Sequence, residues 1–238
     1  MTRTEFARLL DHSVLKPEAT EADLLAGAEV VAAWNIGFYC VQPSWIKLAS
    51  AALADTDATV VTVIGFPHGC DAMEVKVQAA AIAVAEGAGE VDMVQNFGLL
   101  RSGHANLVAA EIEAVVRAIP GIPVKVILET ATLTDSEKRL ASRIACDAGA
   151  AYLKTSTGFH PGGGATIADV ALLREVAGQR VGVKASGGIR TLADAQAMLD
   201  AGANRIGTSA SASILAAIDP TDQGRASASP WERKSGPG

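Results

Sequence analysis

Short apolar segments rich in β-branched residues recur along this chain and alternate with Ala- and Leu-rich stretches of helical periodicity. Eight such segments occur, at residues 7–11, 36–41, 59–64, 90–94, 124–128, 150–154, 181–185 and 204–207. The clearest helical stretches between them are residues 21–35, 72–89 and 191–203. Strand and helix alternating at this spacing predict a parallel sheet with crossover helices.

Eight consecutive βα units predict an α/β fold, a single (β/α)8 TIM barrel, although the same pattern also fits an open, doubly wound sheet. The chain has 238 residues, of which 49% are hydrophobic, so it has enough apolar material for one well-packed domain. We expect this barrel to cover residues 1–218. Residues 219–238 are rich in Pro, Ser, Gly and charge, which predicts a flexible C-terminal tail.

The charge of the chain limits the classes of binding partner that we expect, and its cysteines indicate the cellular compartment. The formal net charge is −6, and Lys and Arg form no cluster, which disfavours binding to nucleic acid or to an anionic membrane and favours a small-molecule partner. The apolar stretches are too short to span a bilayer. The three cysteines lie far apart, and the first residues contain no apolar run of signal-peptide length, so we expect a reduced, cytoplasmic protein.

Charged residues occupy several of the predicted strands, where burial of an unpaired charge is costly. They are Asp11 at the end of the first strand, Glu90 and Asp92 on one face of the fourth, Lys125 and Glu129 on one face of the fifth, Lys154 at the end of the sixth, and Lys184 near the end of the seventh. Any one of them alone is as often an outward residue or half of a structural ion pair. Together they indicate a reactive centre, because functional groups of barrels gather at the carboxyl ends of the strands.

Lys154 and Lys184 lie on strands that are neighbours in a barrel. Repulsion between two ammonium groups, together with desolvation, is expected to lower the pKa of each lysine. One of them would then be a neutral amine, the form that attacks a carbonyl carbon to give a Schiff base.

A series of motifs then occurs in one order along residues 8–218. These motifs are LDHSVLKPEAT, CVQPSW, VIGFPHG, GAGEVDMVQNFGLLRSG, VKVILET, YLKTSTGF, VKASGGIRT and RIGTSAS. The chain resembles the deoxyribose-phosphate aldolase family in these motifs, and KTSTGF together with KASGGIR makes the resemblance specific. It implies a class I aldolase, a lyase that needs no cofactor and cleaves 2-deoxy-D-ribose 5-phosphate reversibly to D-glyceraldehyde 3-phosphate and acetaldehyde in deoxyribose phosphate catabolism.

The resemblance also implies roles for individual residues. Lys154 of KTSTG would form the Schiff base, and Lys184 of VKASGG would lower its pKa. Asp92 of EVDMV would help to move protons, through a water molecule and with Lys184, while Asp11 would support this set. Members of the family often pair, so we expect a homodimer.

Two positions depart from patterns found within the family. Some members end in a tyrosine that reaches back to the site, whereas residues 219–238 contain Trp231 and no tyrosine. Some carry a lysine directly after KTSTG, where this chain has Phe159. The second difference removes one candidate cation for the substrate phosphate.

Glycine-containing turns after the last two strands indicate where a phosphate would bind. In barrels, backbone N–H groups of the loops after strands seven and eight often hold phosphate. The predicted substrate- and phosphate-binding residues are Thr157, Gly158, Gly187, Gly188 and Ser209. A single Gly-Gly pair is more often a plain turn, and a hydroxyl at a strand end is as often a local cap.

Other reaction classes remain as alternatives. The four histidines have no metal-ligand spacing, which disfavours a zinc-dependent aldolase, and we expect no metal site. A phosphate-binding barrel isomerase would share the glycine turns but would not need two adjacent inward lysines. A non-catalytic sugar-phosphate binder is the third alternative.

Overall fold

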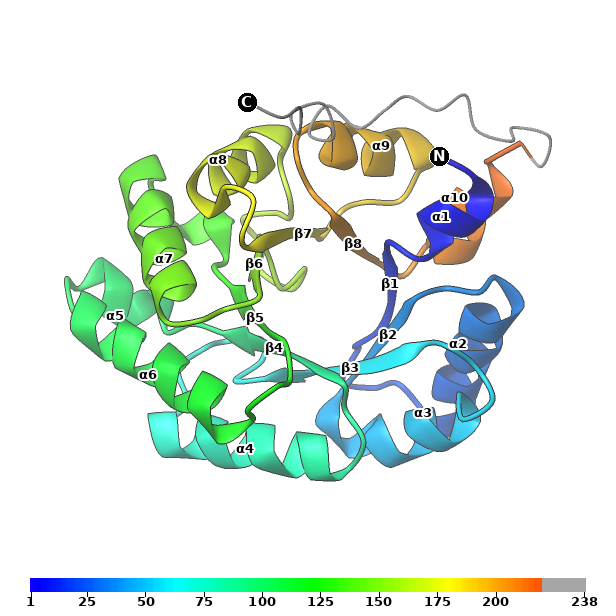
Figure 1. Ribbon diagram of the computed structural model, residues 1–238, viewed down its shortest axis with the longest axis horizontal. Helices are drawn as coiled ribbons and strands as arrows, with labels where there is room; N and C mark the ends of the chain where they lie inside the picture. The colour runs from blue at the N-terminus through cyan, green and yellow to red at the C-terminus, as the bar shows by residue number, and fades with distance from the viewer. Residues whose placement is uncertain (220–238) are drawn as a thin grey trace, which may run out of the picture.

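A computed structural model describes residues 1–219 and contains a closed barrel of parallel strands in chain order (Figure 1). The strands are β1 Leu10–Val14, β2 Phe38–Val41, β3 Thr59–Ile64, β4 Glu90–Val94, β5 Val124–Ile127, β6 Tyr152–Lys154, β7 Gly182–Ser186 and β8 Arg205–Thr208. Each strand pairs in parallel with the next, and β8 closes the barrel against β1. The predicted (β/α)8 barrel is confirmed, and the open sheet is excluded.

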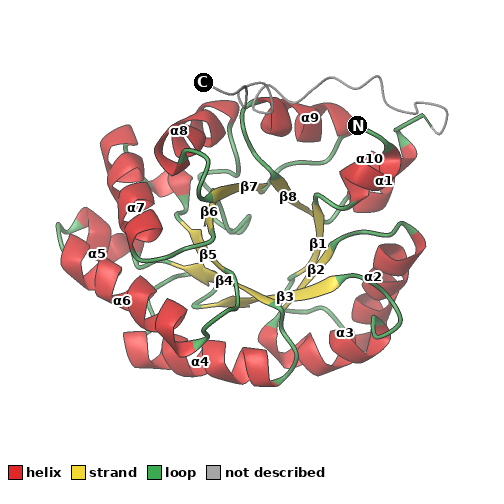
Figure 2. Ribbon diagram, in the orientation of Figure 1, coloured by secondary structure: helices red, strands yellow, loops and turns green. Residues whose placement is uncertain are grey.

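Helices form a ring around this barrel (Figure 2). They are α1 Arg3–Ala7, α2 Glu21–Ala33, α3 Ile46–Ala52, α4 Met73–Ala85, α5 Phe97–Arg101, α6 Ala105–Ala118, α7 Asp135–Asp147, α8 Ile167–Ala177, α9 Leu192–Asp200 and α10 Ser211–Ala216. Short 3₁₀ turns, Pro43–Trp45 and Thr130–Thr132, follow β2 and β5.

Threonines mark the first turns of many of these helices. Thr20, Thr134 and Thr191 each accept a hydrogen bond from the third residue of the helix, whose Asp or Glu side chain bonds back to the threonine N–H. This reciprocal capping satisfies two backbone donors that would otherwise lack partners, and it sets the residue at which the helix begins. The sequence therefore determines where the loops before α2, α7 and α9 end.

The main apolar core lies between the barrel and the helix ring. Outward-facing strand residues such as Tyr39, Val91 and Leu153 are fully buried there together with helix residues such as Ile112 and Leu173. The strands of a parallel barrel are covered on both faces, so they read as continuous apolar runs. A charged residue inside such a run therefore points to the barrel interior.

The barrel interior contains one apolar region. Leu15, Cys40, Val61 and Val63 form a small buried cluster on the side of β1 to β3, and Phe66 packs against it. The buried charged residues of the strands come mainly from β4 to β8, together with Asp11 of β1. The two halves thus provide an apolar wall opposite a polar one.

The prediction for the first strand is wrong in its position. Residues 3–7 form α1, because Thr2 and Glu5 make a capping box that starts a helix there. The strand begins only at Leu10, so Asp11 is its second residue and does not close it. The predicted flexible tail, residues 219–238, lies almost wholly outside the described residues.

None of the helices in residues 1–219 combines the length and hydropathy that a membrane span requires.

Candidate active site

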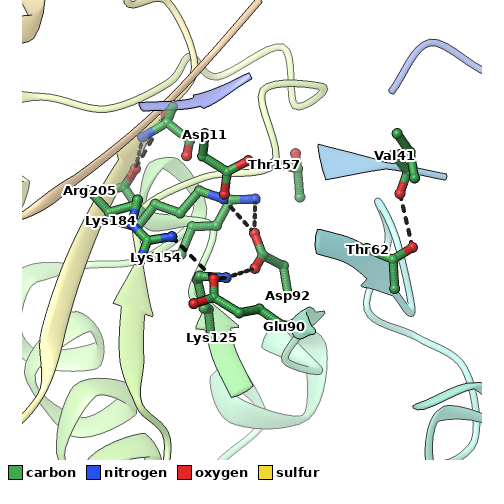
Figure 3. A network of polar contacts seen from close by, with 12 residues as sticks. Asp11, Val41, Thr62, Glu90, Asp92, Lys125, Lys154, Thr157, Lys184 and Arg205 are labelled. Atoms are coloured by element: carbon green, nitrogen blue, oxygen red, sulfur yellow. Dashed lines mark hydrogen bonds and ion pairs between the residues drawn. The ribbon is translucent and has the colours of Figure 1, made fainter. Parts of the chain in front are cut away.

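A single carboxylate, that of Asp92 in the middle of β4, receives three ammonium groups inside the barrel (Figure 3). Lys154 donates to Asp92 Oδ2 at 2.8 Å, and Lys184 donates to the same oxygen at 2.8 Å. Lys125 donates to Oδ1 at 2.9 Å. The three residues predicted to be catalytic are therefore in direct contact.

Strand register explains this convergence. Lys154 is the last residue of β6 and lies opposite Lys184 of β7, while Asp92 of β4 lies opposite Lys125 of β5. Residues at the same level of neighbouring parallel strands point to the same side, so both pairs project inward. Lys184 occupies the third of the five positions in β7 rather than its end, yet the shorter β6 places Lys154 beside it.

Asp11 extends the cluster on the other side. Lys184 also donates to Asp11 Oδ2, so Lys184 bridges two carboxylates. Asp11 Oδ1 is buried and has no partner among the described residues. The supporting residue is thus in contact with the catalytic set, although it is the second residue of β1 and not the last, as the sequence predicts.

Burial and ion pairing act in opposite directions on these groups. Burial by itself raises the pKa of Asp92, but the ammonium groups of Lys125, Lys154 and Lys184 outweigh it and hold the pKa of Asp92 well below its ordinary value. Burial by itself lowers the pKa of Lys184, and the carboxylates of Asp11 and Asp92 outweigh it, so the pKa of Lys184 is raised. Asp92 is therefore ionised and Lys184 protonated at neutral pH.

The raised pKa of Lys184 corrects the sequence-based expectation that repulsion between Lys154 and Lys184 lowers both pKa values. That expectation counted the two lysines and omitted the carboxylates between and beside them. Asp11 and Asp92 both contact Lys184, and an opposite charge within hydrogen-bond distance outweighs a like charge farther away.

The cluster continues toward the amino-terminal end of the barrel. Lys125 also contacts Glu90 at 2.5 Å, and Glu90 accepts from Arg205 at 3.1 Å. The Arg205 guanidinium lies 3.2 Å from the centroid of the Phe38 ring and donates to the Tyr152 hydroxyl at 3.2 Å. Sequence reasoning grouped Glu90 with Asp92 correctly, but it missed Arg205, because an arginine at the start of a strand has no distinctive pattern.

A count of charges singles out Lys154. The connected network contains four basic side chains (Lys125, Lys154, Lys184 and Arg205) and three carboxylates (Asp11, Glu90 and Asp92), one fewer than the bases. Lys125 and Lys184 each contact two carboxylates, whereas within the described residues Lys154 contacts one. Among the three lysines, Lys154 therefore has the fewest ion pairs to lose when it acts as a neutral amine.

Glu129 does not share a face with Lys125 as predicted. β5 ends at Ile127, and Glu129 follows it with a left-handed backbone, φ 53° and ψ 62°. The alternation of a regular strand stops before this residue. Its carboxylate turns instead toward the loop after β6, where it accepts two hydrogen bonds from Thr157.

The predicted phosphate-binding residues lie after β6, β7 and β8. Gly158, Gly187 and Gly188 all have positive φ, and a side-chain carbon at Gly158 would lie 3.7 Å from the Cα atom of Gly187. The turns after β6 and β7 therefore meet. The Thr208 hydroxyl donates to Ile189 O at 2.7 Å, which fastens the end of β8 to the turn after β7, and Ser209 is exposed directly after it.

Two polar residues near the site are structural. Burial lowers the pKa of His12 to about 4, and its Nδ1 lies 3.1 Å from the Ser211 hydroxyl while its ring stacks on Tyr39. Burial raises the pKa of the Cys40 thiol to about 12, so this thiol is a weak nucleophile, as expected for a small apolar residue. Among the described residues, no group of His, Cys, Asp or Glu is arranged to hold a metal ion.

A second buried ion pair escaped sequence reasoning. Lys76 of α4 contacts Glu111 of α6 at 2.8 Å and donates to the carbonyl oxygens of Gly69 and Val94. These bonds fasten the Gly65–Gly69 loop after β3 to the end of β4. Both charged residues lie on helices, and the sequence pattern alone does not distinguish them from exposed helix residues.

Comparisons with known proteins agree with this geometry. The sequence profile of the DeoC/LacD family aldolases matches residues 6–217, which is nearly the entire barrel. The chain belongs to the DeoC/LacD aldolase family.

Individual relatives of this aldolase chain are similar over most of their length. The deoxyribose-phosphate aldolase of Enterococcus faecalis is 50% identical over 186 residues, 78% of this chain and 84% of the relative. The solved structure of the aldolase QR15 is 40% identical with a TM-score of 0.84, covering 88% of this chain and 94% of that one. A tetrameric structure of the deoxyribose phosphate aldolase from Aeropyrum pernix is 31% identical, also with a TM-score of 0.84, covering 90% of this chain and 91% of that one.

Proposed function

We propose that this protein is a class I deoxyribose-phosphate aldolase, which cleaves 2-deoxy-D-ribose 5-phosphate reversibly to D-glyceraldehyde 3-phosphate and acetaldehyde. The observation that carries the proposal is the arrangement of Lys154 and Lys184 on one oxygen of Asp92, both at 2.8 Å. A lysine nucleophile beside a protonated lysine and an ionised carboxylate provides every group that Schiff-base chemistry needs. The family profile and the relatives named deoxyribose-phosphate aldolase support the substrate.

Lys154 is the proposed nucleophile. Its neutral Nζ adds to C1 of the open-chain aldehyde, and loss of water gives an iminium ion. The iminium withdraws electrons as the C3 hydroxyl loses its proton and the C2–C3 bond breaks, which releases glyceraldehyde 3-phosphate. Protonation of the remaining enamine at C2 and hydrolysis of the resulting iminium free acetaldehyde and restore the Lys154 amine.

Asp92 and Lys184 are proposed to move the protons as a pair. The depressed pKa of Asp92 keeps this carboxylate ionised, which suits a proton acceptor that acts through a water molecule. The raised pKa of Lys184 keeps this amine protonated, which suits a donor. Asp11 holds Lys184 from the opposite side and so supports its orientation.

The substrate phosphate is proposed to bind between the turns after β6, β7 and β8. Gly187 and Gly188 have φ values of 88° and 81°, a backbone form that exposes N–H groups to a bound anion. Thr157, Gly158 and Ser209 complete the proposed phosphate site. Fixed backbone dipoles bind a dianion without a cation at position 159, where this chain has Phe159.

The proposal also covers the location, the substrates and the oligomeric state of the protein. We expect a cytoplasmic protein that works on small-molecule sugar phosphates and aldehydes and pairs as a homodimer. Sedimentation velocity of the full chain separates a dimer from a tetramer such as the one described for the Aeropyrum pernix relative.

A cleavage assay tests the function directly. The full chain is incubated with 2-deoxy-D-ribose 5-phosphate, and both aldehyde products are measured, before and after dialysis against EDTA. Equimolar glyceraldehyde 3-phosphate and acetaldehyde, unchanged by the chelator, are expected. An isomerised pentose phosphate without acetaldehyde would support the barrel isomerase, and binding without any product would support the non-catalytic binder.

A further inference from the structure

Glu129 adopts a left-handed backbone conformation, which residues other than glycine rarely adopt. Its φ is 53°, and its side chain is buried, with 1% of the residue exposed. On either side of it, Leu128 N–H bonds to Lys154 O and Thr130 N–H bonds to Thr155 O, both at 2.9 Å. Two residues of this segment thus advance past one residue of the neighbouring strand, which makes Glu129 the extra residue of a bulge.

The bulge directs the Glu129 side chain at one partner. Oε2 accepts from the Thr157 hydroxyl at 2.5 Å and from the Thr157 backbone N–H at 3.2 Å. Oε1 has no partner among the described residues. A bulge changes the direction in which its side chain points. The left-handed conformation at Glu129 therefore places the Glu129 carboxylate against Thr157.

Thr157 also constrains the residues that follow it in the turn. Its hydroxyl oxygen accepts from the Phe159 N–H at 3.1 Å, so residues 157–159 are held as one unit. The Phe159 ring then meets Phe66, from the loop after β3, at a centroid distance of 5.3 Å and an interplanar angle of 83°. The turn that begins after Lys154 thus extends across the mouth of the barrel.

We propose that Glu129 is a positioning residue for the aldolase reaction: through Thr157, it holds residues 155–159 in the form that binds the sugar phosphate. This inference rests on the proposed function and adds a residue to it. Without Glu129 the turn samples other conformations, and substrate binding must select the correct one. The KM for the phosphorylated substrate then rises in inverse proportion to the fraction of molecules in which the turn keeps the binding conformation.

Two substitutions at Glu129 weaken its contact with Thr157 to different degrees. Glu129→Gln keeps an oxygen that accepts both Thr157 donors but removes the charge, whereas Glu129→Ala removes the acceptor. Charge-assisted hydrogen bonds are stronger than neutral ones, so Glu129→Gln is expected to lose less than Glu129→Ala. Glu175→Ala on α8, where the carboxylate is exposed and pairs with Arg139, is the matched control and is expected to leave activity unchanged.

The measurements are kcat and KM with 2-deoxy-D-ribose 5-phosphate and the yield of borohydride trapping with acetaldehyde, which has no phosphate. For Glu129→Ala, we expect KM to rise about tenfold or more, by analogy with other misplaced binding groups, and trapping to fall less than kcat/KM. Glu129→Gln should recover much of the loss. Adding Glu129→Ala to Thr157→Val should cost no more than Thr157→Val alone, because both remove one contact.

Two results with the Glu129 variants would overturn the proposal. One is a Glu129→Ala variant with wild-type kcat and KM. The other is an equal fall in trapping and in kcat/KM without recovery in Glu129→Gln, which indicates general damage to the barrel. If Glu129→Ala does not fold, Thr157→Val must lose more than Thr157→Ser, which keeps the hydroxyl, and equal losses would likewise overturn the proposal. A wild-type chain that neither cleaves the sugar nor is trapped would instead refute the aldolase function itself.

Discussion

Lys154 and Asp92 are joined by a hydrogen bond of 2.8 Å between Nζ and Oδ2, although 62 positions separate them in the chain. The bond reaches across the barrel interior from the end of β6 to the middle of β4. Because Lys184 donates to the same oxygen, any change in the charge of Asp92 acts on both amines at once. The charge of Asp92 therefore affects both the proposed nucleophile, Lys154, and the proposed proton donor, Lys184.

Removal of the charge at Asp92 tests its proposed role in proton transfer. Asp92→Asn keeps the shape of the side chain but loses the proton acceptor, so kcat should fall about 100-fold or more. Steady-state cleavage of 2-deoxy-D-ribose 5-phosphate measures the effect. Asp147→Asn, at an exposed position of α7, should keep wild-type kcat. A kcat for Asp92→Asn near that of the control would remove Asp92 from the mechanism.

The depressed pKa of Asp92 makes a prediction about acid stability. A carboxyl group whose pKa is lower in the folded chain than the unfolded value of about 3.9 stabilises the fold above that value. This stabilisation is lost as the pH falls through the folded pKa. The difference in Tm between wild type and Asp92→Asn should therefore be constant above about pH 5 and should shrink as the pH falls below it toward the folded pKa. Thermal unfolding followed by circular dichroism measures it, and a constant difference would contradict the assigned pKa direction.

Lys184 and Asp11 form a buried pair whose partners depend on each other. Lys184→Met leaves the Asp11 carboxylate with no cation among its described neighbours, which should cost about 3–5 kcal/mol of unfolding free energy. Adding Asp11→Asn removes the stranded charge, so the double variant should be more stable than Lys184→Met alone. Urea unfolding of Lys184→Met, Asp11→Asn and the double variant measures the coupling. Strictly additive losses would show that the pair does not stabilise the fold.

Ser209 tests the proposed phosphate site. Ser209 is exposed directly after β8, so Ser209→Asp adds a carboxylate at the proposed phosphate site. Repulsion should raise KM for 2-deoxy-D-ribose 5-phosphate about tenfold or more and should change cleavage of unphosphorylated 2-deoxyribose little. Equal losses on both sugars would place the damage in the barrel itself. Unchanged kinetics on both would place Ser209 outside the site and make Arg190 the next candidate.

The barrel was predictable from the sequence because each βα unit carries its own signals. An apolar β-branched run, a capping threonine such as Thr191 and an Ala-rich helix recur with little interruption. The inward lysines were predictable for the same reason, since a charge in a run that is apolar on both faces has only the interior to occupy. Lys154 and Lys184 are confirmed there.

The contacts that sequence reasoning missed depend on three-dimensional proximity or on a local break in regular structure. Lys76 and Glu111 meet only because α4 and α6 are neighbours. Glu129 left the face of Lys125 because its backbone turns left-handed, and alternation applies only within a regular strand. The pKa of Lys184 was misjudged because Asp11 approaches it from β1, at the other end of the chain.

Locating the covalent adduct is the most direct test of Lys154 as the Schiff-base nucleophile. The full chain is incubated with acetaldehyde and sodium borohydride, digested and analysed by mass spectrometry. We predict one ethylated lysine, Lys154, with no adduct at Lys125 or Lys184, and no adduct in Lys154→Met. An adduct at Lys184 or Lys125 in the wild-type chain, or undiminished labelling in Lys154→Met, would contradict the assignment of the nucleophile.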